Sequence, residues 1–145
     1  MATFISHSPT ETESLGEAWG RAAERGLVIA LSGELGAGKT QLVKGIARGL
    51  GITERVHSPT FTLVNEYGGG CLKLFHLDLY RLETRGEILS AGLEEFLQPD
   101  GVAVIEWAER LEDGRGTMED GKIKKVKIEI VGKTERKIIY DDFGA

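Results

Sequence analysis

The sequence has little cysteine, no long apolar run and no excess of positive charge. One cysteine, Cys71, stands among 145 residues, so no disulfide can form within the chain, as is usual in a reducing compartment. Its place in an apolar strand pattern favours packing over nucleophilic chemistry. No apolar run reaches membrane-span length, and residues 1–6 lack the basic start and apolar core of a signal peptide. These absences predict a cytoplasmic protein that does not enter a membrane.

The charge balance argues against a protein that binds nucleic acid over its whole surface. There are 23 acidic residues against 18 Lys and Arg, for a net charge of −5, whereas such a protein needs a basic face. Basic residues gather at 122–127 and 133–137, and we interpret both groups as solvated strand faces.

The length and the 41% hydrophobic content predict one domain, residues 1–145. The 20 glycines form no repeat and are expected in loops.

The most informative stretch is a phosphate-binding loop. Residues 33–40 read Gly33-Glu34-Leu35-Gly36-Ala37-Gly38-Lys39-Thr40 and match the pattern G-x-x-x-x-G-K-[ST]. An apolar strand pattern at 27–31 precedes the loop and a helical pattern at 39–50 follows it, which is the context that the motif requires. The glycines let backbone N–H groups turn toward phosphates, and the helix N-terminus adds partial positive charge. Lys39 can reach the β- and γ-phosphates, and Thr40 places a hydroxyl where magnesium would bind.

The first half of the chain predicts a strand at Phe4 and Ile5, followed by a helix from Pro9 to about Arg25. Ser8 can cap this helix, Glu11 completes a capping box, and Gly26 ends it. Alternating residues at 61–67 and 71–78, around a turn at 68–70, predict an antiparallel strand pair.

The second half predicts short helices at 87–97, a buried parallel strand at 102–106, a helix start at 107–111 and a loop at 112–122. Strands at 126–131 and 137–140 predict a terminal hairpin with its turn at 132–135. The Gly-Lys-Thr within that turn is no second phosphate loop, because Lys127 holds the position of the first glycine. The fold class is therefore α/β, a P-loop NTPase fold with a mainly parallel sheet, helices on both faces and the ligand at the carboxyl ends of the strands.

Two acidic residues end apolar strands and are candidates to hold a metal ion or orient an attacking water. Asp78 follows the apolar residues 74–77, and Glu106 follows 102–105. The strand that ends at Glu106 is the more uniformly apolar, so we expect it beside the strand of the phosphate loop. The sequence leaves open which acid lies nearer the metal, and whether either acid only pairs with a nearby Arg or Lys.

Three other residues have competing interpretations. Thr60, within Ser58-Pro59-Thr60, stands where nucleotide-sensing switch segments often lie, but an ordinary turn explains it equally well. His76 is interpreted as a strand residue and not a metal ligand, because no second histidine has ligand spacing. Trp107 is either a core residue or an exposed contact.

Four motifs in order make the chain similar to the bacterial TsaE family. They are the phosphate loop at 33–40, Ser-Pro-Thr-Phe-Thr-Leu-Val-Asn-Glu-Tyr at 58–67, His-Leu-Asp-Leu-Tyr-Arg-Leu at 76–82 and Ile-Glu-Trp-Ala-Glu-Arg-Leu at 105–111. The resemblance runs from Thr12 to about Arg136. Residues 112–122 depart from it, because they lack the proline-rich connection expected in the family.

The resemblance implies a small ATPase with weak intrinsic activity that uses ATP and magnesium. TsaE-like proteins support the synthesis of threonylcarbamoyladenosine in tRNAs that read ANN codons. They act on a TsaD–TsaB complex, which performs the transfer, so contact with tRNA would be indirect, through the complex.

The resemblance also assigns roles on this chain. For nucleotide binding it implies Thr12, Gly33, Glu34, Leu35, Gly36, Ala37, Gly38, Lys39, Thr40, Gln41, Thr60, Lys133 and Arg136, with Thr12, Lys133 and Arg136 on the adenine side. For the metal it implies Thr40, Asp78 and Glu106; for catalysis, Lys39, Asp78 and Glu106; and for partner contact, Trp107.

Three alternative functions are consistent with a phosphate loop. A small-molecule kinase would add an arginine-rich lid, but the arginines after Asp78 do not cluster. A GTPase would need Asn-Lys-x-Asp, which is absent, and Asp-x-x-Gly, in which Arg81 takes the glycine position. A nucleotide-gated binding module would differ only in not needing hydrolysis. The missing arginine cluster also predicts slow hydrolysis without a partner.

Overall fold

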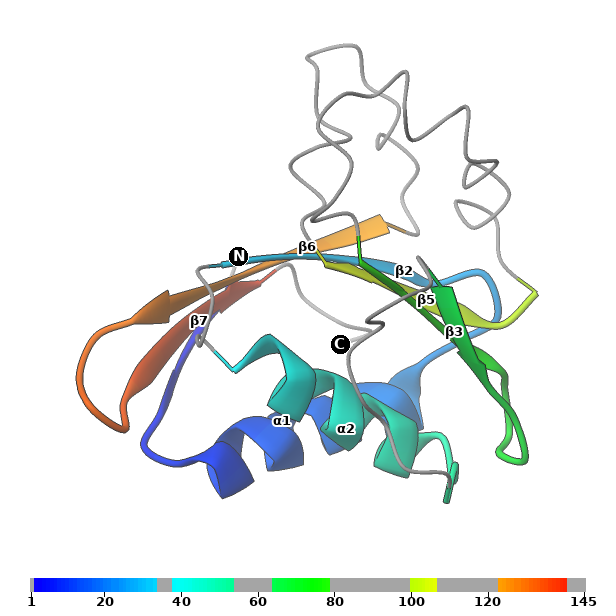
Figure 1. The fold of residues 1–145 in the computed structure, drawn as a ribbon, viewed down its shortest axis with the longest axis horizontal. Coiled ribbons are helices and arrows are strands. Elements are labelled where there is room, and N and C mark those ends of the chain that lie inside the picture. The colour runs from blue at the N-terminus through cyan, green and yellow to red at the C-terminus, as the bar shows by residue number, and fades with distance from the viewer. Residues whose placement is uncertain (1, 34–37, 54–63, 79–99, 107–122, 141–145) are drawn as a thin grey trace, which may run out of the picture.

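The computed structural model describes residues 2–33, 38–53, 64–78, 100–106 and 123–140, which form one sheet and two helices (Figure 1). Seven strands are present in these ranges, in the order β1-β7-β6-β2-β5-β4-β3. The elements are β1 Ala2–Ser6, α1 Pro9–Ala22, β2 Val28–Gly33, α2 Lys39–Gly49, β3 Val64–Tyr67, β4 Leu74–Asp78, β5 Val102–Glu106, β6 Ile123–Ile130 and β7 Arg136–Tyr140.

The centre of the sheet is parallel and its margins are antiparallel. Strand β2 lies between β5 and β6 and is parallel to both, and β4 is parallel to β5. The pairs β3–β4, β6–β7 and β1–β7 are antiparallel. This arrangement confirms the predicted fold class, the inserted antiparallel pair and the terminal hairpin. It also confirms that the strand ending at Glu106 adjoins the strand of the phosphate loop. The pairing of β1 with the hairpin was not predicted.

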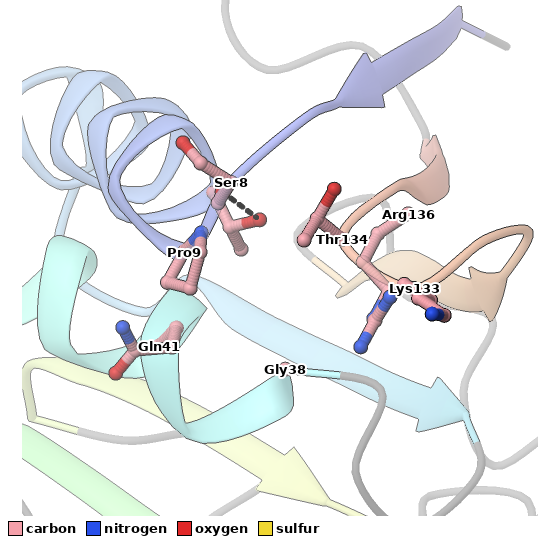
Figure 2. A pocket seen from close by; sticks show the side chains of 8 residues that line it. Ser8, Pro9, Gly38, Gln41, Lys133, Thr134 and Arg136 are labelled. Atoms are coloured by element: carbon pink, nitrogen blue, oxygen red, sulfur yellow. Dashed lines mark hydrogen bonds between the residues drawn. The ribbon is translucent and has the colours of Figure 1, made fainter.

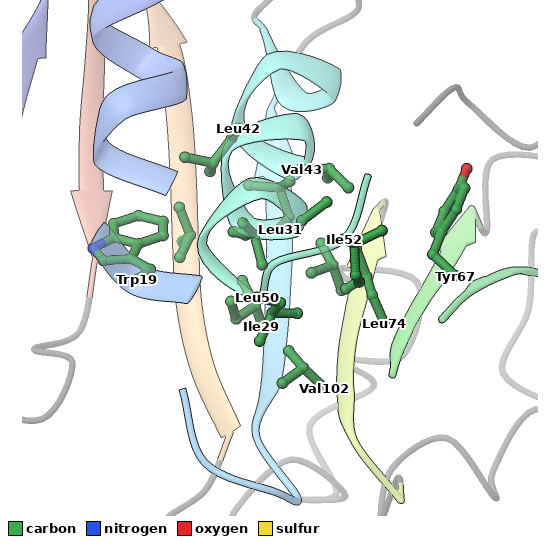
Figure 3. Close-up of a cluster of buried hydrophobic side chains, with 14 of the residues drawn as sticks. Trp19, Ile29, Leu31, Leu42, Val43, Leu50, Ile52, Tyr67, Leu74 and Val102 are labelled. Carbon is green, nitrogen blue, oxygen red and sulfur yellow. The ribbon is translucent and has the colours of Figure 1, made fainter. Parts of the chain in front are cut away.

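The core lies between the sheet and the helices. Figure 1 shows α1 and α2 on the same face of the sheet. Ile29 and Leu31 of β2 pack there with Leu42 of α2 and Trp19 of α1 (Figure 3). Every residue of β5 is buried, as a strand covered on both faces requires. The other predicted helices fall at 87–97 and 107–111, outside the described residues, so helices on the second face stay a prediction.

Helix α1 begins with the predicted capping residues. Ser8 is the N-cap, and its hydroxyl accepts a hydrogen bond from the backbone N–H of Glu11 at 3.1 Å. The Glu11 carboxylate accepts from the N–H of His7, also at 3.1 Å. The helix ends at Ala22 and not at about Arg25, because Ala23 is already extended, with φ −67° and ψ 142°.

Glycines line the crossing between the two helices. Gly16 and Gly20 of α1 meet Gly45 and Gly49 of α2, and a Cβ on Gly45 would lie 2.0 Å from the carbonyl oxygen of Glu13. A glycine within a helix costs up to about 1 kcal/mol relative to alanine, so these four are explained by the close approach of the two backbones. The prediction that the glycines lie in loops is wrong for them. The crossing fixes α2 against α1.

Two predictions from composition concern membrane spans and Cys71. No helix within the described ranges is long and apolar enough to cross a bilayer. Cys71 is exposed, so the prediction that it packs in an apolar strand is wrong. The reason is that β4 begins only at Leu74, while Cys71 lies in a bend whose backbone N–H donates to the carbonyl of Leu50 at 2.8 Å.

Candidate functional site

The site starts where β2 ends and α2 begins. Gly38, the N-cap of α2, has φ +101°, a conformation that side chains disfavour, although a Cβ there would meet nothing within 4 Å. Lys39 follows as the first helical residue. It is 6% exposed, and its Nζ donates to the carbonyl of Gly33 at 2.8 Å. Lys39 therefore links the two ends of the loop 34–37, whose residues Glu34, Leu35, Gly36 and Ala37 lie outside the described residues.

The N-terminus of α2 suits an anion. Its N-cap is a glycine, no side chain in the described part of the chain caps it, and its first turn holds no acidic residue. The first N–H groups of a helix lack partners within the helix, and the helix dipole places partial positive charge there. Lys39 adds a full positive charge at the same point. These groups fit a phosphate chain, and the hydroxyl of half-buried Thr40 fits the oxygen donors that magnesium prefers.

A hollow of about 220 Å³ adjoins this helix end. Its walls come from the start of α1, the start of α2 and the β6–β7 hairpin turn: Ser8, Pro9, Thr12, Gly38, Gln41, Lys133, Thr134 and Arg136. Figure 2 shows Ser8 and Pro9 on one side and Lys133 and Thr134 on the other, with Gln41 and Gly38 below. A cavity of about 150 Å³ can hold benzene, so this hollow has room for a two-ring base.

The hollow brings together residues that the sequence analysis placed on the adenine side, and it adds others. Thr12, Lys133 and Arg136 all line it, together with Gln41. Ser8, Pro9 and Thr134 also line it and were not predicted as site residues. The signal for them was present but had a local explanation, since Ser8-Pro9 read as a helix start and Thr134 read as part of a turn. The rejection of a second phosphate loop at 132–134 is confirmed, because these residues connect β6 to β7.

Hydrogen bonds hold the walls of the hollow. The hydroxyls of Ser6 and Thr12 lie 2.7 Å apart, and the Ser6 hydroxyl also donates to the carbonyl of Ser8 at 2.8 Å. Across the hollow, Nη1 of Arg136 donates to two carbonyls of the hairpin turn, at 2.9 and 3.0 Å. Thr12 is only 2% exposed. The hydroxyl of Thr12 and the guanidinium of Arg136 thus support the shape of the hollow.

The two candidate acids end neighbouring strands. Asp78 of β4 and Glu106 of β5 are partners in the parallel register, and Glu106 is also the partner of Leu31 in β2. Because Leu31 packs in the core with α2, Glu106 faces the same side of the sheet as α2. Glu106 is 4% exposed, and its Oε2 contacts Nε2 of His76. Among the described residues, Glu106 therefore pairs with a histidine and not with the arginine or lysine of the alternative.

Several predicted residues fall outside the described ranges. These are Thr60 and Trp107, in addition to loop residues 34–37, while Asp78 is described by its backbone alone. The structure thus joins the phosphate-loop ends, the hollow and Glu106 on one side of the sheet.

Comparisons with known proteins agree on one family. The family model "Threonylcarbamoyl adenosine biosynthesis protein TsaE" matches residues 6–138. The tRNA threonylcarbamoyladenosine biosynthesis protein TsaE of Bacillus subtilis is 40% identical over 141 residues, which cover 94% of this chain and 83% of that protein. The protein of that name from Nostoc sp. is 51% identical over 115 residues, 77% of this chain and 70% of that protein. The crystal structure of Bacillus subtilis YdiB superposes with a TM-score of 0.77 at 33% identity, over 99% of this chain and 86% of that one.

Proposed function

The chain belongs to the TsaE family of threonylcarbamoyl adenosine biosynthesis proteins, and on this premise we propose that it is a magnesium-dependent ATPase. It acts through a TsaD–TsaB complex in the modification of tRNAs that read ANN codons. The tRNA is reached through that complex and not by this chain directly. The observation that carries the ATP-binding part is the N-terminus of α2, which has a glycine N-cap and no acidic residue in its first turn, and where nearly buried Lys39 adjoins a hollow of the size that a base requires.

Each part of the site has one task in this proposal. Lys39 and the N–H groups at the start of α2 neutralise the phosphates, and the hollow between α1 and the hairpin turn accepts the adenine. Glu106, with Asp78 beside it in the register, orients the metal or the attacking water. Magnesium, held by Thr40 and one of the acids, would neutralise charge on the β- and γ-phosphates.

The proposal includes slow turnover in the isolated protein. Enzymes of this kind gain about 10³- to 10⁵-fold in rate from an arginine that approaches the phosphates, and the arginines after Asp78 form no cluster. A partner would complete the site. Trp107, directly after Glu106, is the residue proposed to contact that partner, and Thr60 is proposed to respond to the γ-phosphate.

The test is steady-state ATP hydrolysis by the purified chain, alone and with TsaD–TsaB. We expect slow hydrolysis alone, at least tenfold stimulation by the complex, and loss of both activities in Lys39→Ala. Hundreds of turnovers per second by the chain alone would contradict the need for a partner. No stimulation together with no complex formation would favour a small-molecule kinase, for which a metabolite screen would then seek a phosphoryl acceptor.

The role of the hollow has its own test. Thr134→Phe places a ring in the hollow and should weaken ATP binding at least tenfold, about 1.4 kcal/mol, because the base loses its place. Binding of inorganic tripolyphosphate, which has no base, should change less than twofold. Thr3→Phe, at an exposed position of β1, is the matched control. Equal weakening of ATP and tripolyphosphate, measured by titration calorimetry, would show that the hollow does not hold the base.

A further inference from the structure

The buried pair of His76 and Glu106 is not explained by the roles assigned so far. His76 of β4 is 0% exposed and Glu106 of β5 is 4% exposed. His76 Nε2 and Glu106 Oε2 are hydrogen-bonded. The other ring nitrogen, Nδ1, is the one buried side-chain nitrogen or oxygen without a hydrogen-bond partner in the part of the chain that the structure describes. Two polar groups are thus kept in the core, and one of their atoms is left unpaired.

Stability does not account for this pair. Leu74, on the same face of β4, and Val104, the register partner of His76, are both fully buried, so an apolar side chain would suit the surroundings of His76. Burying a carboxylate and an imidazole removes both from water, and a buried polar atom without a partner keeps that desolvation penalty. An arrangement that costs stability at the end of a strand beside the phosphate loop points to function.

The hydrogen bond indicates which ring nitrogen faces the carboxylate. An ionised carboxylate only accepts hydrogen bonds, so Nε2 of His76 must carry the proton and donate it to Oε2. Nδ1 makes no hydrogen bond to the described residues, so the donation from Nε2 is the contact that links the ring to Glu106. One carboxylate oxygen of Glu106 is held by this donor. The carboxylate cannot rotate about its terminal bond without losing it.

We propose that His76 is a positioning residue for ATP hydrolysis, which holds the Glu106 carboxylate in the orientation that the reaction requires. This inference rests on the proposed function, because it needs Glu106 to orient the metal or the attacking water. The geometry suits the role: His76 reaches Glu106 from the neighbouring strand, and its own register partner, Val104, lies two residues before Glu106 on the same face. Groups that orient ligands at metal sites typically contribute about 10- to 100-fold when removed.

Three substitutions separate positioning from packing. His76→Gln can place its amide nitrogen near the position of Nε2, His76→Asn can place its amide nitrogen only near Nδ1, and His76→Leu leaves no nitrogen at either position. We expect kcat to fall about 10- to 100-fold in the Asn and Leu variants and to stay within about threefold of wild type in the Gln variant. KM for ATP should change less than threefold in all three, and thermal unfolding should show that each is folded. Equal kcat in all three variants and the wild type would overturn the inference.

A double substitution tests whether His76 acts through Glu106. In a Glu106→Gln background, His76→Leu should lower kcat by less than twofold, because the group that it positions is already gone. If the loss of kcat in the double variant instead equalled the product of the two single-variant losses, the inference would be overturned.

A second readout needs neither nucleotide nor turnover. Nitrogen NMR of the free protein should show a proton on Nε2 of His76, and an Nε2 without a proton would overturn the inference. The two proposals fail separately in these experiments. A wild-type protein that does not hydrolyse ATP, alone or with TsaD–TsaB, overturns the proposed function and this inference together. A wild-type protein that does hydrolyse ATP, with variants that match it, overturns this inference alone.

Discussion

Gly45→Ala should destabilise the fold by about 3 kcal/mol and lower the melting temperature by about 10 °C. The added Cβ would lie 2.0 Å from the carbonyl oxygen of Glu13 and 2.8 Å from its carbonyl carbon, both backbone atoms of α1. Helix propensity alone favours alanine over glycine by about 1 kcal/mol. Because the clash is with backbone, the helices must move apart, and the loss of packing exceeds the gain in propensity. Thermal unfolding measures the sign directly.

Gly68→Ala is the matched control for this prediction. A Cβ on Gly68 would meet nothing within 4 Å, and its φ is not positive, so stability should change by less than about 0.5 kcal/mol. If Gly45→Ala instead raised the melting temperature, helix propensity would outweigh packing, and the close crossing of α1 and α2 would be wrong.

Glu106→Gln should lower the kcat of ATP hydrolysis about 1000-fold and change the Kd of ATP less than threefold. The amide keeps the shape of the side chain but removes the negative charge that orients the metal or the water. Asp100→Asn, at an exposed acid that pairs with Arg25 across 3.3 Å, is the control and should leave kcat unchanged. A kcat within tenfold of wild type for Glu106→Gln, with a large loss for Asp78→Asn, would assign the role to Asp78 instead.

The Glu106→Gln variant also tests whether tRNA modification requires ATP hydrolysis. A Glu106→Gln protein that binds ATP but does not turn over should fail to support tRNA threonylcarbamoyladenosine synthesis with TsaD–TsaB. Full support would favour the alternative of a nucleotide-gated binding module, in which hydrolysis is incidental.

The parts of the fold that the sequence predicted are those with a local signal. The phosphate loop fixed the strand before it and the helix after it, and the apolar run before Glu106 indicated a central strand. Pairings between distant segments carried no such signal. The pairing of β1 with β7 joins the two ends of the chain, and the glycines of α1 and α2 have a reason only once the helices cross.

The residues of the candidate site could likewise be predicted only where they carry a local signal. Lys39 and Glu106 followed from motif and strand pattern, whereas Lys133 and Arg136 followed only from family resemblance. Their place opposite α1 depends on β1 and β7 being neighbours. The contact of His76 with Glu106 depends on the register between β4 and β5, which strand patterns do not specify.

The central claim is that Lys39 and the start of α2 bind the phosphates of ATP. Titration calorimetry of Mg-ATP against the wild-type chain and Lys39→Ala tests this claim most directly, with GTP as a competing ligand. We predict that the wild type binds ATP at least as tightly as GTP, and that Lys39→Ala weakens ATP binding at least tenfold, about 1.4 kcal/mol. Equal affinity of the two proteins for ATP, or far tighter binding of GTP, would contradict the account.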